Sequence, residues 1–546
     1  MTDHIDLVRR SLAGSEAFDR RVSRQADRLA AAVDDGAFDN EAATLGLELE
    51  VYAVTDEESP RLAPIPEAVF DGPADKELGL HNAEINAAPS AFDGAGIAAQ
   101  AEAVAADLEA TRERAREHGL EIVLDAMWAV PPAEGTDAYL DDVTVHGGDE
   151  TSGAAADPDE SRERVVPGGD PEDPILVAEN MRRDPRYGAL DNEAVRRAGG
   201  AIDFSVPGVD RSYRSILFES LATSVQPHVQ VPDAAAFPRY HNLATRTLGP
   251  LVALSANSPF LPGDCYDVDD PRALVDDTHH ELRIAAFEQS MNQACRKVRV
   301  PDDLDDPTDV VEHVVADDTY APFLAEWVGA GSTDPDSETG DGPTVGDDPV
   351  DIGDCWEFDY KRGTFWRWVR GVVCGDAVAE ACDERSLRIE YRPIPTQPTV
   401  RDTVGLQVLT AGLLGGLVAA DHPLTDLSHE AAEESFYAAV RDGPDADLAW
   451  VTADGERTGD SDEIFAEVFE FARRGLETQG VDADTRDRYL DPLEARREAG
   501  ATPSSWKKDR VREGLDDGLS LAEALEATQR EYIDLSRETE SFAEWL

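Results

Sequence analysis

Four short segments alternate apolar and polar residues, and this pattern constrains the fold more than any other feature of the sequence. Successive side chains of a β-strand point to opposite faces, so each segment predicts a strand with one apolar and one polar face. The segments are residues 45–52, 82–87, 224–231 and 387–392. If the four strands share a sheet, their polar faces form one surface.

The first segment places two carboxylates on its polar face. Glu48 and Glu50 lie two residues apart, so their side chains are roughly 7 Å apart on the same face of a strand. At an effective dielectric constant of 20, two such charges repel by about 2 kcal/mol, and a divalent cation between them reverses the sign. For this segment alone, a solvated acidic face on an amphipathic edge strand is the alternative.

The other three segments add amide, carboxylate, histidine and arginine groups. Their polar faces consist of Asn82, Glu84 and Asn86, of Ser224, Gln226, His228 and Gln230, and of Arg388, Glu390 and Arg392. Glu77 precedes Glu84 in a short loop, and Pro227 predicts that its strand lies at an edge or contains a bulge. Oxygen ligands of this kind suit Mg²⁺ or Mn²⁺, and Arg suits phosphoryl and carboxylate groups.

The chain is strongly acidic, with 114 Asp and Glu against 49 Lys and Arg in 546 residues, a formal net charge of −65. This charge repels phosphates and anionic lipid headgroups, so we expect neither nucleic acid nor membrane as a partner. The basic residues are almost all Arg, which together with the acidity is typical of a salt-rich, halophilic cytoplasm. In 1 M salt the Debye length is about 3 Å, so repulsion between surface charges is largely screened. With no signal peptide and no apolar run of about 18–20 residues, we predict a cytoplasmic location. The oligomeric state stays open.

The remaining pattern predicts an α+β architecture, a sheet surrounded by helices. Helices are expected over 1–40 and 94–118, a buried strand over 121–130, and a mostly helical chain after Asp402. Residues 131–173 and 329–350 are rich in Pro, Gly and acidic residues and are predicted to be exposed acidic loop insertions. Lys507 and Lys508 are expected on a solvated helix face.

We therefore predict two parts. Residues 1–420 form a catalytic domain that carries both acidic insertions, and residues 421–546 form a helical C-terminal region. The sequence contains no GxxxxGK[ST] phosphate loop, no GxGxxG motif after a strand, no HExxH motif and no GxSxG motif. If ATP binds, we expect it to bind on the sheet with metal ions rather than on a phosphate loop.

The polar-faced strands resemble a known family. Gly46-Leu47-Glu48-Leu49-Glu50 is similar to the Gly-x-Glu-x-Glu opening of the glutamate–cysteine ligase family, the carboxylate–amine ligases. Residues 253–260 resemble a block of its bacterial and archaeal branch, and Arg186-Tyr187 resembles a further element. Residues 388–402, with Arg388-x-Glu390-x-Arg392, resemble its closing strand and turn. The blocks occur in the family's order.

The resemblance implies a fold like that of glutamine synthetase, in which a curved antiparallel sheet forms a funnel with metal ions at its floor. It implies a ligase that uses ATP and Mg²⁺, with Mn²⁺ as a possible substitute, in thiol biosynthesis. The small-molecule substrates are then glutamate, cysteine and ATP. Phosphorylation of the glutamate γ-carboxylate would give an acyl phosphate, which the cysteine amine attacks to form γ-glutamylcysteine.

The resemblance also implies roles for individual residues. The implied metal ligands are Glu48, Glu50, Glu77, Glu84 and Glu390. Arg388 and Arg392 would face the phosphoryl group or glutamate as catalytic residues, and His228 and Gln230 fall where the family often has a His-x-His strand and would contact the nucleotide. Arg367 is a further candidate for the nucleotide, because the segment 361–370 is rich in Arg and aromatic residues, although packing explains that segment equally well.

Two departures from the family pattern leave the amine open. Gln230 replaces the second His, and residues 125–128 stand where many members carry a Gly-Thr-His-Pro-like turn. The alternatives are a γ-glutamyl ligase for a different amine, a non-catalytic nucleotide-binding paralogue, and a phosphotransferase that stops at the phosphorylated acid. Fold analogy alone does not separate them.

Overall fold

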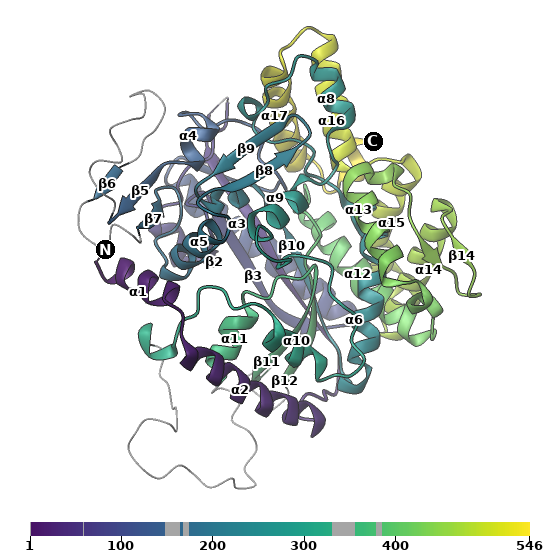
Figure 1. Ribbon diagram of the computed structural model, residues 1–546. Helices are drawn as coiled ribbons and strands as arrows, with labels where there is room; N and C mark the ends of the chain where they lie inside the picture. The colour runs from purple at the N-terminus through teal and green to yellow at the C-terminus, as the bar shows by residue number, and fades with distance from the viewer. Residues whose placement is uncertain (1, 58, 148–163, 167–173, 330–354, 378–384) are drawn as a thin grey trace, which may run out of the picture.

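The four polar-faced segments lie in one antiparallel sheet in the computed structural model (Figure 1). The structure describes residues 2–57, 59–147, 164–166, 174–329, 355–377 and 385–546. Within these residues the sheet runs β11 (Val369–Ala377), β12 (Arg385–Tyr391), β10 (Val225–Gln230), β1 (Thr44–Thr55), β3 (Asn82–Ala91) and β2 (Ala74–Lys76), and β4 (Leu120–Val123) also pairs with β1. The predicted mixture of helices and antiparallel sheet is confirmed, whereas a curved, funnel-forming sheet stays a prediction.

The strand register aligns the polar faces as the alternation predicts. Glu48 lies opposite Gln226 on one side and Asn86 on the other, and Glu50 lies opposite Glu84. Farther across the sheet, His228 pairs with Glu390. Because directly opposed residues of paired strands share a face, these groups all lie on one surface.

Pro227 lies in the interior of the sheet, not at its edge. β10 pairs with β1 on one side and with β12 on the other, so the edge alternative is wrong. The register between β10 and the chain of β12 shifts by one residue between the pair His228–Glu390 and the isolated bridge Ser224–Pro395. The bulge alternative is therefore the one that fits, because a bulge removes the ladder hydrogen bond that Pro cannot donate.

Helices surround the sheet (Figure 1). Up to the end of β10 they are α1 (Thr2–Leu12), α2 (Glu16–Asp34), α3 (Gly94–Arg116), α4 (Thr136–Leu140), α5 (Pro185–Arg197) and the 3-10 helix η3 (Ile216–Leu221). Those between β10 and β11 are α6 (Phe237–Arg246), α7 (Leu248–Ser255), α8 (Pro271–Asp277), α9 (Leu282–Met291), α10 (Asp309–Ala316) and α11 (Trp356–Arg362). The predicted helices over 1–40 and 94–118 are confirmed as α1, α2 and α3.

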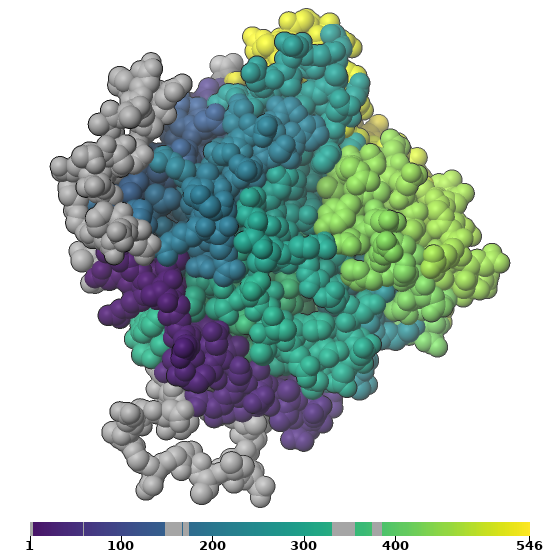
Figure 2. Space-filling view, in the orientation of Figure 1, coloured from purple at the N-terminus to yellow at the C-terminus, as the bar shows by residue number. Residues whose placement is uncertain are grey.

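The chain after β12 is mostly helical, as predicted. It contains α12 (Val400–Ala419), α13 (His429–Asp442), α14 (Ser461–Thr478), α15 (Ala483–Ala499), α16 (Pro503–Asp516), α17 (Leu521–Glu538) and the short hairpin of β13 (Trp450–Val451) and β14 (Arg457–Thr458). In Figure 2 this region forms the right side of the face shown, and the N-terminal helices lie at the lower left. One hydrophobic cluster joins both parts, since Leu49, Leu413 and Leu490 belong to it. The division at residue 420 stays a prediction.

α12 packs on the sheet side opposite the polar surface. It contacts β10 and α3, and Gln407 donates from Nε2 to the carbonyl of Gly46 at 2.8 Å. By length and composition it is the one helix in the described residues that could cross a membrane, but 83% of its apolar window is buried inside the structure. Its apolar composition is explained by burial in the core.

Two sequence predictions are wrong in part. The strand expected over 121–130 ends at Val123, where the chain turns and the Asp125 carboxylate accepts from the N–H of Ala126 at 2.7 Å. Within the expected loop 131–173, α4 is largely buried, and β5 (Val143–His146) pairs with β6 (Arg164–Val166) and β7 (Ile175–Ala178). Residues 148–163, 167–173 and 330–354 lie outside the described residues. The remaining small sheet pairs β8 (Ile202–Val206) with β9 (Val209–Tyr213).

Lys507 and Lys508 are buried, so the prediction of a solvated helix face is wrong for both. Lys507 Nζ lies 2.5 Å from Asp125 Oδ1 and 2.8 Å from the carbonyl of Asn257. Gln529 donates to the other Asp125 oxygen at 2.6 Å. The helices α16 and α17 are thus joined by buried polar groups to the turn that follows β4.

Candidate active site

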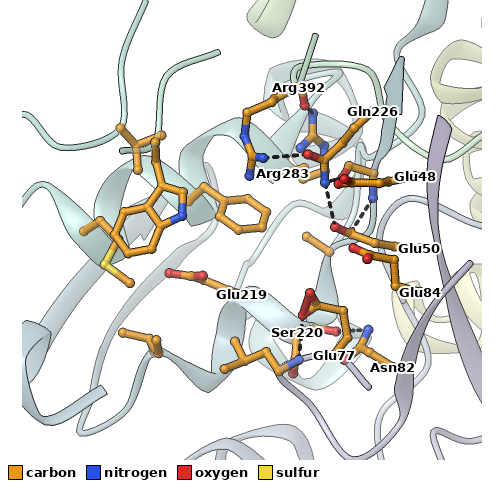
Figure 3. A pocket seen from close by; sticks show the side chains of 18 of the residues that line it. Glu48, Glu50, Glu77, Asn82, Glu84, Glu219, Ser220, Gln226, Arg283 and Arg392 are labelled. Carbon is orange, nitrogen blue, oxygen red and sulfur yellow. Dashed lines mark hydrogen bonds between the residues drawn. The ribbon is translucent and has the colours of Figure 1, made fainter. Parts of the chain in front are cut away.

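The polar face of the sheet forms one wall of a cavity of about 360 Å³ (Figure 3). The opposite wall comes from α5, η3, α9 and the segment 363–368. The strands contribute Glu48, Glu50, Lys76, Asn82, Glu84, Gln226 and Arg370, and Arg392 follows the end of β12. Figure 3 shows the carboxylates following one another along one side, with Arg392 and Arg283 at one end.

Glu50, Glu77 and Glu84 form a tight carboxylate group. One oxygen of each lies within 4.8 Å of the other two. Glu50 accepts from the N–H of Ser224 at 2.7 Å, Glu77 from the N–H of Leu78 at 2.7 Å, and Glu84 from the Asn86 amide at 2.7 Å. Within the part of the chain that the structure describes, no Lys or Arg forms an ion pair with any of the three.

The proximity of these carboxylates changes their protonation. Burial, followed by the charges of neighbouring carboxylates, raises the pKa of Glu84 to about 8 and that of Glu77 to about 7. Burial also raises the pKa of Glu50, against the opposing effect of Arg283. Without a cation the group therefore keeps protons near neutral pH. Three hard oxygen ligands with uncompensated charge fit Mg²⁺ or Mn²⁺.

Glu48, His228 and Glu390 form a second group whose ligand atoms also lie within 4.8 Å of one another. Burial lowers the pKa of His228 to about 3, so its ring is neutral, and its buried Nε2 makes no hydrogen bond to any residue that the structure describes. This nitrogen lies 3.3 Å from Glu48 Oε1 and 3.9 Å from Glu390 Oε2. A neutral, unpartnered ring nitrogen between two carboxylates fits a metal ligand.

Two arginines neutralise Glu390. Arg370 donates from Nη2 to both carboxylate oxygens, at 2.7 and 2.8 Å, and Arg392 donates to Oε1. Burial acts to raise the pKa of Glu390, but the two guanidinium groups outweigh it and hold that pKa well below its ordinary value. The Glu50–Glu77–Glu84 group, which lacks such cations, is therefore the better-fitting cation site of the two.

The structure separates the predicted residues into two sets. Glu48, Glu50, Glu77, Glu84, Arg392 and Arg367 line the cavity, and His228 and Glu390 contact this lining from the sheet. Gln230 and Arg388 pair with each other one step farther along the strands and are not among the lining residues. Arg367 lies in the wall, but its guanidinium group donates to Asp317 at 2.7 Å and to the carbonyl of Lys297.

Besides Lys76, whose ammonium group pairs with Glu67, sequence reasoning missed three charged residues of the cavity lining. Arg370 lies opposite Glu390 on β11, a strand whose mixed sequence gives no clear alternation. Arg283 on α9 donates to the carbonyls of Arg392 and Pro393, and Glu219 lies on η3. Arg370 is in the Arg-rich segment 361–370, so that segment was the available signal. No local pattern marks the other two.

The raised carboxyl pKa values predict a pH-dependent stabilisation by divalent cations. The folded protein keeps protons on Glu48 and Glu84 up to about pH 8, whereas the unfolded chain loses them near 4.5. Stability from these groups therefore falls as pH rises through this window. We expect millimolar Mg²⁺ or Mn²⁺ to raise the melting temperature more at about pH 9 than at about pH 6, where protons compete with the cation.

Differential scanning fluorimetry in molar KCl checks this expectation. Extra KCl of equal ionic strength is the control for general screening. An equal shift at both pH values, or an unchanged shift in Glu84→Gln, contradicts a cation site at these carboxylates.

Comparison with known proteins gives one family. The sequence model of Glutamate-cysteine ligase family 2 (GCS2) matches residues 44–534. No curated protein matches the chain. Among solved structures, a glutamate–cysteine ligase from Francisella tularensis in complex with AMP is 13% identical with a TM-score of 0.49, covering 92% of this chain and 90% of that one. A bifunctional glutathione synthetase from Pasteurella multocida is 14% identical with a TM-score of 0.46, covering 95% of this chain and 55% of that one.

Proposed function

Since the chain belongs to glutamate–cysteine ligase family 2 and is a ligase that forms an amide bond, we propose that it uses ATP and Mg²⁺ to join glutamate to cysteine. The observation that carries the proposal is that one cavity is lined both by carboxylates without a cationic partner among the described residues and by arginines. A cation held by the carboxylates would attract a polyanion such as a triphosphate. The arginines at one end of the cavity would add hydrogen bonds to it.

The chemistry needs positioned charges more than a nucleophilic side chain. A carboxylate is a poor electrophile, and phosphorylation by ATP converts it to an acyl phosphate with a good leaving group. The amine then displaces phosphate and forms γ-glutamylcysteine. Bound Mg²⁺, or Mn²⁺, supplies neutralisation of phosphate charge.

We assign the residues as follows. Glu50, Glu77 and Glu84 hold one cation, and Glu48 with His228 contributes a second set of ligands beside Glu390. Arg392 faces the phosphoryl group or glutamate, and its bonds to Glu390 and to Gln226 Oε1 at 2.5 Å fix its direction. Roles for Arg388, Gln230 and Arg367 as phosphoryl or nucleotide contacts stay predictions.

The broader setting is part of the same proposal. The sheet would be the funnel-forming sheet of the glutamine synthetase type, carried by residues 1–420, with 421–546 as a helical region packed on it. The enzyme would act in a salt-rich cytoplasm on small molecules, in thiol biosynthesis. The acidity of the whole chain and the nearly complete replacement of Lys by Arg support this setting.

Measurement of ADP release in molar KCl with Mg²⁺ and glutamate tests the function. We expect turnover that depends on cysteine and a γ-glutamylcysteine product identified by mass spectrometry. If turnover occurs only with another amine, that amine is the substrate in place of cysteine. Glutamate-dependent ADP release without an amide product indicates a phosphotransferase, and a folded protein without any turnover indicates a non-catalytic paralogue.

A further inference from the structure

Glu219 is a carboxyl group of the cavity that the proposed chemistry does not yet use. It lies on η3, in the wall opposite the sheet, and is 7% exposed. Figure 3 shows its carboxylate across the cavity from the row of sheet carboxylates. Glu219 belongs to neither group of candidate cation ligands, so its position calls for a different partner.

The fold holds this carboxylate in a fixed direction. η3 packs against α5 and α9. Asp191 of α5 accepts from the N–H of Ile216 at 2.8 Å, which anchors the start of η3. Ser290 of α9 donates its hydroxyl to Glu219 Oε1. Within the described residues no Lys or Arg forms an ion pair with Glu219, so a single hydroxyl orients it while its charge stays uncompensated.

The cavity wall around η3 combines apolar side chains with two arginines, Arg186 of α5 and Arg283 of α9, neither of which pairs with Glu219 within the described residues. Lining residues from the three elements η3, α5 and α9 include Ile216, Leu190, Phe287 and Met291. A carboxylate held among such side chains is costly unless a cation neutralises it or it takes a proton. Burial raises the pKa of Glu219 to about 8, with the Ser290 hydroxyl opposing and Glu77 and Asp191 adding to the rise. A cationic ligand group or a proton therefore suits this position.

We propose that Glu219 receives the ammonium group of the amine substrate and takes a proton from it before attack. This inference rests on the proposed function and adds the residue that binds and deprotonates the amine, which arrives in its ammonium form beside a small apolar or thiol-bearing group. The ammonium ion supplies the cation that the Glu219 site lacks. Its conversion to the free amine creates the lone pair that the reaction needs.

One N–H bond of the ammonium group breaks, and the proton moves to the Glu219 carboxylate. The nitrogen lone pair forms the C–N bond at the acyl phosphate carbon, and the C–O bond to phosphate breaks with its electron pair leaving on phosphate. The nitrogen then holds one proton more than the amide, and the departing phosphate takes it.

Hydroxylamine separates this role from every earlier step. It is mostly uncharged at neutral pH, so it attacks an acyl phosphate without a proton acceptor and gives a coloured hydroxamate. In Glu219→Gln we expect kcat with cysteine to fall by about 10²-fold or more, the usual contribution of general base catalysis. Glutamate- and ATP-dependent hydroxamate formation should stay within a few-fold of the wild type.

Two variants complete the test. Glu219→Asp keeps a carboxylate at a longer reach and should retain more cysteine-dependent activity than Glu219→Gln. Glu288→Gln is the matched control, because Glu288 is also a largely buried carboxyl, bonded to Trp368 Nε1 at 2.8 Å and Tyr437 Oη at 2.7 Å, and it does not line the cavity. It should leave the ratio of the two activities unchanged.

Two results overturn the inference alone. They are cysteine-dependent activity of Glu219→Gln within a few-fold of the wild type, and an equal loss with cysteine and hydroxylamine. If the wild type produces neither product, the proposed function itself fails, and the inference fails with it. The behaviour of the wild type thus distinguishes the two failures.

Discussion

Replacing Glu50 by Gln reduces glutamate- and cysteine-dependent ADP release by about 10²- to 10³-fold, the usual effect of removing one preorganised charge partner of a transition state. The expected cause is loss of one of the three carboxylates that hold the cation. Gln keeps the size of the side chain and an oxygen that can accept from the Ser224 N–H. The fold around β1 and β10 is therefore retained while the charge is lost.

The same variant should be more stable than the wild type when no divalent cation is present. Burial raises the pKa of Glu50, which means that its charged form is disfavoured in the folded protein. Removing the charge relieves this cost, so the melting temperature without Mg²⁺ rises while the Mg²⁺-induced shift shrinks. Activity and stability should thus change in opposite directions.

Steady-state kinetics and thermal unfolding on one preparation check both results. Glu121→Gln is the matched control, since Glu121 lies on β4 of the same sheet and pairs with Arg537 rather than lining the cavity. Full activity in Glu50→Gln would falsify its assignment as a cation ligand. Loss of activity together with lowered stability would indicate a misfolded site.

Replacing Lys507 by Met lowers the free energy of unfolding by about 3–5 kcal/mol, the usual cost of removing one partner from a buried ion pair. Asp125 is fully buried, and Lys507 Nζ at 2.5 Å is its cationic partner. Met fills a similar volume, so a lost charge rather than a cavity dominates the effect. Asp125 is left with the Gln529 amide at 2.6 Å, a neutral donor.

The neighbouring lysine provides the comparison. Lys508 Nζ donates to the carbonyls of Thr278 at 2.8 Å and Asp276 at 3.4 Å, and no carboxylate of the described residues forms an ion pair with it. Lys508→Met should therefore lower the free energy of unfolding by less than Lys507→Met does. The double variant Lys507→Met with Asp125→Asn should recover part of the stability that Lys507→Met alone loses. Urea unfolding in molar KCl measures the free energy of unfolding of the wild type, the two single Met variants and the double variant. Equal losses in the two single Met variants would contradict the argument.

The strands of the site were predictable because each carries a two-residue period. Alternation places Glu48, Glu50 and Glu84 on polar faces, and the register of β1 and β3 then brings them together. The pattern fails where a strand lacks it: β11 contributes Arg370 without clear alternation. Pro227 predicted either an edge strand or a bulge, and local sequence does not choose between them, because the choice depends on whether β12 pairs beside it.

The remaining site residues depend on tertiary packing. Glu219 and Arg283 enter the cavity from η3 and α9, whose sequences give no period that marks a site. Lys507 is of a residue type that usually lies on the surface, and its partner Asp125 is 382 residues away in the sequence. Local propensity contains no information about such a pair. The predicted loop over 131–173 failed similarly, since β5 is stabilised by pairing with β7.

The pairing of Asp125 with Lys507 also bears on the order of events during synthesis. The turn after β4 is made early, but its carboxylate has no cationic partner until α16 follows nearly four hundred residues later. Until then the growing chain must keep this charge hydrated. The same turn contacts Thr223 next to β10, whose hydroxyl donates to the Asp125 carbonyl. In a ribosome-bound chain that stops before α16, the turn after β4 should therefore be less stable than in the complete protein, by about the cost of removing one partner of a buried ion pair.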